Sequence, residues 1–359
     1  MKKMLALILC LCLLTNASFA ERLLVTSDWH LTEDEAAFSP MLQALGRALA
    51  GDDILLVLGD NTNNSHVEEH HFVKSSLEAL QKTTGHEVYV IPGNHDFSGA
   101  FRAEDFVTLY EDFGWKQAFS RDTDSASYAV MTGGGVCLLM MDTNTWGAGH
   151  ALPGGGESEE TLAWVKSTLA SLPEDTRVIA CGHHPILPEG RGHDGLAGVL
   201  TQAGVTLYLC GHDHGFGAVR AGTLQQITVG QSQAYPGYAG HISLSDAGFT
   251  WETLSLYAED DPWFSAIRAQ SQALALQMGS GTLRGTVHEG DEEAIDWFVR
   301  CFALIQTGSL TEETCASLLR EEGARKWSEI ETSTVVKGWL FGILNNCPQD
   351  VRHIEQPWN

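Results

Sequence analysis

The sequence predicts an α/β domain followed by a helical segment, and two observations carry this prediction. From residue 21 to about 256, short apolar runs alternate with amphipathic stretches, which is typical of β-sheets covered by helices. After Leu256 the apolar residues recur at intervals of three and four, which is the period of a helix. We therefore expect an α/β domain at 21–256 and a helical C-terminal domain at 257–359.

Six strands and four helices are predicted within the α/β domain. Each strand is an apolar run that ends in a polar or glycine-containing turn, and the six runs are 23–27, 54–58, 87–91, 136–141, 177–181 and 205–210. The helices are expected at 40–50, 65–82, 103–113 and 158–172. Ser158 is the expected N-cap of the last, because the acidic Glu159 and Glu160 follow it at the positive end of the helix dipole.

Three helices are predicted near the C-terminus. Asp291 is expected to cap the first, whose apolar face consists of Ile295, Phe298, Val299, Phe302 and Ile305. Thr311 is expected to cap the second, which ends at Gly323, and the third runs from about 327 to 344. They carry no ionisable cluster of catalytic type, so a packing face or dimer face is favoured over a substrate lid.

The first 20 residues have the composition of a secretory signal peptide. Lys2 and Lys3 precede an apolar run at 4–14, and small residues lead to Ala20. The apolar run is too short to span a bilayer about 30 Å thick, which disfavours the alternative of a retained anchor. We therefore expect cleavage near Ala20 and a secreted or otherwise extracytoplasmic protein with no stable membrane insertion.

The charge of the chain limits the classes of partner. Acidic residues number 46 against 21 basic residues, a formal net charge of −25. Such a charge repels nucleic-acid duplexes and anionic membrane surfaces. An anionic substrate would therefore need bound metal ions to attract it.

Six of the eight cysteines follow the predicted signal peptide. Cys137, Cys181 and Cys210 lie in or at the end of apolar runs and are expected to be buried thiols. One pair among the remaining three can form a disulfide in an oxidising compartment, and the sequence does not choose among Cys301, Cys315 and Cys347.

Metal-binding residue types follow five of the predicted strands. The motifs are Asp28-Trp29-His30, Gly59-Asp60-Asn61, Gly93-Asn94-His95-Asp96, Gly182-His183-His184-Pro185 and Gly211-His212-Asp213-His214. Ligands bind outside the carboxyl ends of strands in open α/β sheets. We therefore expect the five loops to meet in one crevice.

The residue types in these loops suit a pair of metal ions. Two cations about 3.5–4 Å apart need carboxylate and imidazole ligands and one carboxylate that bridges them, and Asp60 is the expected bridge. Alternate residues of an extended chain point to the same side, so each Asp-x-His or His-x-His pair directs two ligands into one cavity. The glycines before Asp60, Asn94, His183 and His212 let the backbone turn sharply beside the ions.

Together these motifs resemble those of the calcineurin-like metallophosphoesterase superfamily. This resemblance implies a metallophosphoesterase-type βαβ sandwich, with two mixed β-sheets flanked by helices. A narrower similarity is to secreted bacterial class III cyclic-nucleotide phosphodiesterases. It rests on the helical tail and on Gly59-Asp60-Asn61-Thr62-Asn63-Asn64, Asp112-Phe113-Gly114 before Ser127-Tyr128, and Met141-Asp142-Thr143.

The resemblance implies a ligand set for two divalent or trivalent ions. One ion would be held by Asp28, His30, Asp60 and His214, and the other by Asp60, Asn94, His183 and His212. His184 competes with His183, but family motifs of this form place the ligand directly after the glycine. Manganese, iron and zinc all suit these ligands. Asn63 replaces the tyrosine of purple acid phosphatases, which disfavours the coloured iron site.

A mechanism follows as a hypothesis. Two cations lower the pKa of a bridging water towards about 7 and supply a hydroxide that attacks phosphorus. Asn94 and His95 would stabilise charge on the phosphoryl oxygens, and His95, oriented by Asp96, would protonate the leaving group. A purely structural role for His95 is the alternative.

The other histidines and an aromatic loop receive simpler interpretations. His66, His70 and His71 are expected to be solvent-exposed on a helix, whereas His193 and His241 could reach the rim of the cavity. The loop at 235–238 carries two tyrosines that suit either packing or base stacking.

Phosphodiester hydrolysis is the function that the resemblance implies, with a cyclic nucleotide or another small diester as substrate. A phosphomonoesterase or nucleotidase on the same site is the first alternative. A metal-dependent binding protein without turnover is the second, and the complete ligand set disfavours it. The expected partner is a small phosphate ester, and the sequence does not indicate an oligomeric state.

Overall fold

The computed structural model describes residues 20–49, 53–147, 150–188, 190, 192–331, 335–347 and 351–358. The predicted signal peptide lies outside these residues except for Ala20. Among the helices of the described residues, none has the length and apolar character needed to cross a membrane.

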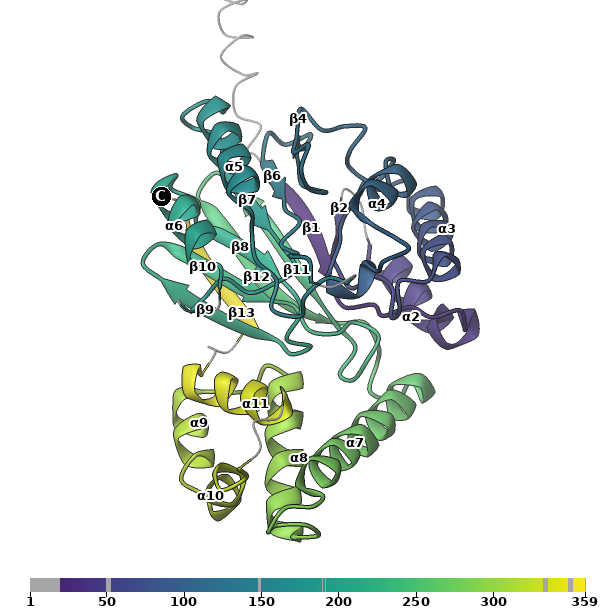
Figure 1. Ribbon diagram of the computed structural model, residues 1–359. Coiled ribbons are helices and arrows are strands. Elements are labelled where there is room, and N and C mark those ends of the chain that lie inside the picture. Colours follow the sequence, from purple (N-terminus) through teal and green to yellow (C-terminus); the bar gives the residue numbers. More distant parts are fainter. Residues whose placement is uncertain are drawn as a thin grey trace, which may run out of the picture.

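Two mixed β-sheets stack face to face in the main part of the molecule (Figure 1). The first sheet has the order β13-β12-β11-β1-β2-β3, with strands β1 (Ala20–Thr26), β2 (Asp53–Leu58), β3 (Val88–Ile91), β11 (Tyr238–Ser245), β12 (Gly248–Ser255) and β13 (His353–Pro357). The second has the order β4-β5-β6-β7-β8-β10-β9, with β4 (Ser120–Arg121), β5 (Tyr128–Met131), β6 (Cys137–Met140), β7 (Val178–Cys181), β8 (Leu207–Cys210), β9 (Gly217–Ala221) and β10 (Leu224–Thr228).

The central strands of both sheets are parallel. β1 pairs with β2 and β2 with β3 in the first sheet, and β6, β7, β8 and β10 form a parallel series in the second. Parallel strands end at the same edge of a sheet. The loops that follow β1, β2 and β3 therefore lie together, as do those that follow β6, β7 and β8.

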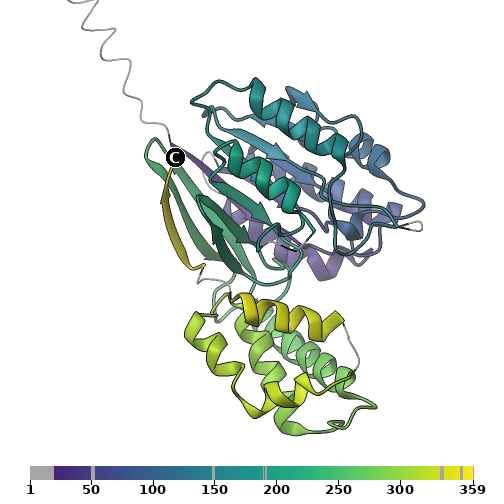
Figure 2. The same cartoon turned by 60° about the vertical axis from the view of Figure 1, so that its left-hand side comes forward.

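Helices cover the sandwich on both sides (Figures 1 and 2). The helices α2 (Glu35–Ala48), α3 (Val67–Thr84) and α4 (Ala103–Leu109) lie beside the first sheet, and α5 (Glu159–Ser171) and α6 (Asp194–Gln202) cover the second. In β6, Leu138 and Met140 join the main core whereas Cys137 and Leu139 pack towards α5 and α6. Both faces of the strand are thus buried, which explains why its sequence is continuously apolar.

The predicted elements of the α/β domain are confirmed. The six expected strands are β1, β2, β3, β6, β7 and β8, and the four expected helices are α2 to α5. Ser158 caps α5 as expected, because its hydroxyl accepts a hydrogen bond from the Thr161 N–H. Cys137, Cys181 and Cys210 are buried and are not part of a disulfide, also as expected.

The helices α7 to α11 form a separate cluster against the end of the sandwich (Figures 1 and 2). They are α7 (Pro262–Leu283), α8 (Glu292–Gln306), α9 (Glu312–Leu318), α10 (Glu322–Ser328) and α11 (Val335–Asn346). Their own core contains Trp297, Phe298, Trp327 and Leu340. The expected caps Asp291 and Thr311 each accept a backbone N–H of their helix.

Two expectations for this region are wrong. Gly323 does not end the helix that Thr311 caps, because α9 ends at Leu318 and Gly323 lies inside α10, where Trp297 packs against it too closely for a larger residue. Residues 327–344 are not one helix either, since α10 ends at Ser328 and α11 begins at Val335.

The last strand corrects the prediction that 257–359 is entirely helical. β13 pairs antiparallel with β12 at the edge of the first sheet. The indole N–H of Trp251 also donates to the carbonyl of Val351, at 2.8 Å. The five helices are therefore inserted between two neighbouring strands of one sheet. Whether they form an independent domain stays a prediction.

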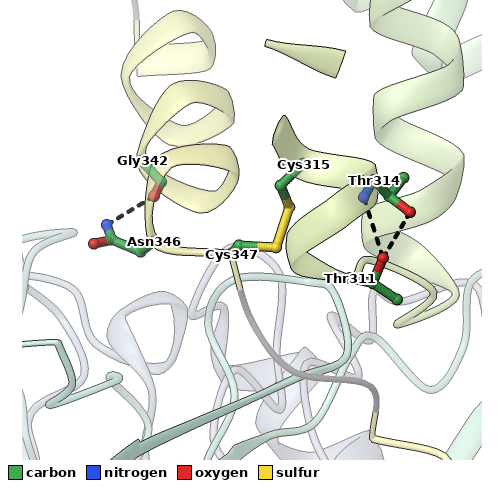
Figure 3. Close-up of a disulfide and its surroundings, with 6 residues drawn as sticks. All are labelled: Thr311, Thr314, Cys315, Gly342, Asn346 and Cys347. Atoms are coloured by element: carbon green, nitrogen blue, oxygen red, sulfur yellow. Dashed lines mark hydrogen bonds between the residues drawn. A yellow bond between two sulfur atoms is a disulfide. The ribbon is translucent and has the colours of Figure 1, made fainter. Parts of the chain in front are cut away.

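A disulfide joins Cys315 at α9 to Cys347 just after α11 (Figure 3). Cys301, the third candidate, is a buried free thiol in the core of the helices. Nearby polar contacts fix both helix ends: Thr311 caps α9, and the Asn346 side chain donates to the carbonyl of Gly342.

We expect the double variant Cys315→Ser/Cys347→Ser to lose about 3–4 kcal/mol of unfolding free energy. The two cysteines are 32 residues apart, and cross-linking a loop of this length restricts the unfolded chain by about that amount. Denaturant titration would measure the loss. Dithiothreitol should lower the denaturant concentration at which half of the parent protein is unfolded, and it should leave that of the double variant unchanged. Equal unfolding midpoints for the two proteins without reductant would contradict the prediction.

Candidate metal centre

The five motif loops meet at one edge of the sandwich. The backbone N–H groups of Asp28 and His30 donate to the carbonyls of Gly59 and Asp60, which joins the loops after β1 and β2. The N–H of His95 donates to Oδ1 of Asp60, and the N–H of His212 donates to the carboxylate of Asp28. Residues 184 positions apart are thus held in one network.

Four of the predicted ligands form a first cluster. One ligand atom each from Asp28, His30, Asp60 and His214 lies within 4.8 Å of all the others. Nε2 of His30 is 3.1 Å from Nε2 of His214, which in turn is 3.4 Å from Oδ1 of Asp28. Three of the four side chains are buried, whereas His214 is 45% exposed, so the cluster opens to solvent on one side.

The remaining predicted ligands form a second cluster. Ligand atoms of His183 and His212, together with one of the neighbouring His184, lie within 4.8 Å of one another, and Nδ1 of His212 lies 3.0 Å from Oδ1 of Asn94. Nδ1–H of His183 donates to the carbonyl of Leu58 at 2.8 Å. This bond fixes the ring and leaves Nε2 as the free ligand atom, as is usual for histidines that bind metals.

Asp60 lies between the two clusters. Its Oδ2 atom is 3.6 Å from Nε2 of His30 in the first cluster and 3.3 Å from Nε2 of His183 in the second. Ligand atoms about 2.0–2.2 Å from one ion lie roughly 3.0–3.5 Å from each other. The side chains thus fit two ions that share Asp60. Nε2 of His183 is buried without a hydrogen-bond partner, and a bound ion would satisfy this atom.

Burial and charge shift the pKa values of these groups strongly. Burial lowers the pKa of His30 to about 3. Burial also acts to lower the pKa of His183, but the carboxylates of Asp60 and Asp28 outweigh it and raise this pKa to about 9. Burial alone would raise the pKa of Asp60, yet His183 and His30 hold it well below its usual range. Asp60 is therefore an anion, as a bridging ligand must be.

Strained backbone conformations concentrate at the same place. Of the seven non-glycine residues with positive φ among those described, five are predicted ligands, with φ between 44° and 72°: Asp28, His30, Asp60, His212 and His214. Each such residue costs about 1–3 kcal/mol and persists only where the surroundings enforce it. Strain of this kind clusters at functional sites, which supports a functional role for these loops.

Glycine is required where the loops touch. A Cβ atom on Gly93 would lie 2.3 Å from Oδ1 of Asp60, and one on Gly211 would lie 2.5 Å from Oδ2 of Asp28. Any larger residue would push the carboxylates out of the clusters. The sequence pattern of glycine before the ligands reflects this close approach.

His184 lies beside the second cluster but is oriented differently. The hydroxyl oxygen of Thr143 accepts the backbone N–H groups of both His183 and His184, so its hydrogen is left for Nδ1 of His184, 2.9 Å away. Nε2 of His184 then carries the ring hydrogen. An N–H group cannot bind a metal ion, so this arrangement favours His183 as the ligand and His184 as a lining residue.

His95 and Asp96 have different environments. The His95 side chain is exposed, and its Nδ1–H donates to the carbonyl of Asn63 at 2.8 Å. Asp96 is buried, and its carboxylate accepts hydrogen bonds from Gly93 N–H and from the backbone and side chains of Asn61 and Thr62. The expectation that Asp96 orients His95 is thus wrong: Asn63 orients the ring, and Asp96 joins the loops after β2 and β3.

We expect Asp96→Ala to lower the unfolding free energy by about 3–5 kcal/mol, because the buried donors of both loops would lose their acceptor. Burial raises the pKa of Asp96 to about 6 despite these donors. The midpoint of urea unfolding would measure the loss. Asp96→Asn keeps one acceptor oxygen and should lose less unfolding free energy than Asp96→Ala. Equal stability of the two variants would refute the role of Asp96 in joining the loops.

His70 corrects a further expectation. Its ring is buried rather than exposed, stacks on Phe101 with centroids 3.7 Å apart, and contacts the hydroxyl of Tyr110 and the carbonyl of Asp96. His66 and His71 are exposed as expected. The sequence pattern missed His70 because its partners lie in the 94–96 turn and on either side of α4, far along the chain.

The other candidate residues divide into two groups. His193 stacks on His184 with centroids 5.7 Å apart and contacts Glu157, so it adjoins the second cluster. His241 lies within β11 opposite Leu24, away from the carboxyl edge. Tyr235 packs against Phe264, and Tyr238 packs against Phe216, which fits the packing role.

The helical region contacts a metal-ligand loop directly. Nε1–H of Trp339 in α11 donates to the carbonyl of Asp213, between His212 and His214. Gly215 faces Ile305 of α8 so closely that a Cβ atom would lie 2.6 Å from it. No motif in the sequence indicated this support, because the residues belong to ordinary helix faces.

Comparisons with known proteins indicate the family of the chain. Residues 21–216 match the family described as calcineurin-like phosphoesterase. Human tartrate-resistant acid phosphatase type 5 is 27% identical over 55% of this chain and 68% of its own length. A probable cyclic nucleotide phosphodiesterase of Rhodococcus erythropolis is 28% identical over 46% of this chain and 52% of its own.

Among solved structures, a purple acid phosphatase from yellow lupin seeds superimposes with a TM-score of 0.48 at 11% identity, over 66% of this chain and 52% of that chain. The chain spans about half to two-thirds of the length of the curated relatives it matches. The family match covers more than half of the sequence, and the two mixed sheets carry the Asp and His clusters at their edge. The chain therefore belongs to the calcineurin-like phosphoesterases, a family of metal-dependent phosphoester hydrolases.

Proposed function

We propose that the protein hydrolyses small phosphodiesters at a centre of two metal ions. The observation that carries this proposal is the position of Asp60 Oδ2, 3.6 Å from His30 Nε2 and 3.3 Å from His183 Nε2. A single carboxylate within reach of two ligand clusters is the requirement of a two-metal site. When bound, such ions supply hydroxide from water at neutral pH and neutralise developing negative charge.

The protein's own residues have distinct tasks in this proposal. Asp28, Asp60 and the histidines of both clusters hold the ions, and the loop glycines keep the ligand atoms in place. The His95 ring is exposed, and the Asn63 carbonyl fixes its Nδ1–H. When the ring is protonated on both nitrogens, Nε2–H is the group that would give its proton to the departing oxygen and leave the neutral imidazole. The Asn94 amide beside His212 would hold a phosphoryl oxygen as well as an ion.

Two observations support a diester as the substrate. The similar protein from Rhodococcus erythropolis is described as a probable cyclic nucleotide phosphodiesterase. Asn63 stands where the resemblance to purple acid phosphatases would require a tyrosine. A cyclic nucleotide is therefore the first substrate to try.

Phosphomonoester hydrolysis is the second candidate, because tartrate-resistant acid phosphatases from five mammals are similar to this chain at 27–30% identity. The same clusters would serve both reactions, so only the rates separate them.

A substrate panel tests both candidates. The purified protein, with its metal content measured and with added manganese, zinc or iron, would be assayed with bis-p-nitrophenyl phosphate, p-nitrophenyl phosphate, 3′,5′-cyclic AMP and AMP. We expect kcat/KM for the diesters to exceed that for the matching monoesters. The reverse order would favour the phosphomonoesterase, and a metal-loaded protein that cleaves none of the four would overturn the proposal.

A further inference from the structure

An aromatic and cationic patch stands on the loops that follow β3 and β6, and none of its residues is a predicted metal ligand. It consists of Phe97, Arg102 and Trp146. The Trp146 ring stacks on Phe97 with centroids 5.5 Å apart, and the guanidinium carbon of Arg102 lies over the Trp146 ring, 4.3 Å from its centroid.

The loops that carry the patch also form the metal site. Phe97 directly follows the Asn94–Asp96 turn, which contains a predicted ligand and the predicted proton donor. On the other side, Thr143 accepts the N–H groups of His183 and His184, and the Asn144 side chain donates to the carbonyl of Pro92. Trp146 is two residues further along. The patch therefore lies on the rim between the loops after β3 and β6.

Arg102 is positioned by its stacking on Trp146, and its N–H groups remain able to bind an anion. Its side chain is exposed, and among the described residues its guanidinium has no carboxylate within 4 Å. The carboxylate of Asp105 instead accepts the backbone N–H of Arg102. Stacking on an aromatic ring reduces the freedom of an arginine while its N–H edge remains able to bind a carboxylate or phosphate.

The charge of the whole chain makes this position unusual. With a net charge of −25, the protein repels anions over most of its surface. An exposed guanidinium that has no acidic partner among the described residues, on a loop of the proposed phosphoester site, offers a local attraction to negative charge.

We propose that Arg102, positioned by Trp146, is a second anion-binding point for substrates that carry another negative group, a carboxylate or a phosphate, on the part of the molecule remote from the reacting phosphorus. The inference rests on the proposed function, because it assumes that a phosphoester reacts at the metal site. It adds a preference for phosphoesters that carry a second negative group. It makes Arg102 a specificity-determining residue.

Phosphonates test this proposal without turnover. Phenylphosphonate and its 3- and 4-carboxy derivatives differ by one carboxylate and cannot be hydrolysed at phosphorus. Calorimetric titration of the metal-loaded protein should show about tenfold tighter binding of at least one carboxy derivative, as one charge-assisted hydrogen-bonded pair contributes. Arg102→Gln should abolish the difference and leave the affinity for phenylphosphonate unchanged.

Further variants separate binding from folding. Arg102→Lys should retain part of the preference, since a charge remains without the planar fork, and Trp146→Ala should reduce it because Arg102 loses its support. Arg220→Gln, an exposed arginine on β9 that donates to the carbonyl of Gly222, should behave as the parent protein.

Two different failures can be told apart. Equal affinity of the parent protein for all three phosphonates would overturn the role of Arg102 even if bis-p-nitrophenyl phosphate is hydrolysed. A carboxylate preference that Arg102→Gln removes would support the anion-binding point, and hydrolysis of the simple diester, measured separately, decides the proposed function.

Discussion

Asp60→Asn is expected to reduce hydrolysis of bis-p-nitrophenyl phosphate by more than about 100-fold and to lower the metal content from two ions per chain to one or none. The substitution keeps the size of the side chain and removes the negative charge between His30 and His183. Changes in residues that only support metal ligands cost about 10–100-fold, and loss of the shared ligand should exceed that. Elemental analysis and steady-state kinetics on one preparation would measure both effects.

Asp124→Asn is the matched control for this experiment. Asp124 is exposed and contacts neighbours in its own turn, so its variant should keep two ions and the parent rate. Circular dichroism of both variants would establish that they are folded. A folded Asp60→Asn protein that retains two ions and near-parent activity would disprove the shared centre.

His95→Ala is expected to have an effect that depends on the leaving group. With 3′,5′-cyclic AMP, whose departing oxygen is a strongly basic sugar alkoxide, kcat should fall by about 10²–10³-fold, within the range for a general acid. With bis-p-nitrophenyl phosphate the departing phenolate needs little protonation, and the fall should be less than about tenfold. The ratio of the two rates therefore measures proton donation separately from binding.

His71→Ala provides the comparison, because His71 is exposed on α3 and is not a predicted ligand or proton donor. It should leave both rates unchanged. Equal losses for both substrates in His95→Ala would assign His95 to binding or charge stabilisation, and no loss with the cyclic nucleotide would exclude the acid role.

The central fold was predictable because its strands are buried on both faces. β2, β7 and β8 are short continuous apolar runs, and each ends at a glycine followed by a polar motif. Strands β4, β5 and β9 to β13 were not predicted. Most of them pair antiparallel and mix buried with exposed residues, and β10, although parallel to β8, contains two adjacent glutamines. β13 in particular reads as a polar tail, and only its pairing with β12 makes it a strand.

The two ligand clusters were predictable because all their members closely follow a buried strand, and in four of the five motifs a glycine stands directly before the first ligand. Contacts that depend on distant segments were not. Asp96 was expected to serve its neighbour His95 and instead joins two loops, and His70 was expected in solvent and instead packs on Phe101. Trp339 reaches Asp213 from 126 residues away. Local sequence contains no signal for such pairings.

The return of the chain to the first sheet after α11 has a practical consequence for studies of truncated forms. A protein cut after β12 would lose the helices and also the strand that covers that edge, which would expose unpaired backbone groups and invite aggregation. Excision of the helices should therefore splice a short linker from residue 257 to residue 351, so that β13 still closes the sheet. The same double attachment means that the five helices are tethered at both ends and cannot swing away as a freely hinged appendage.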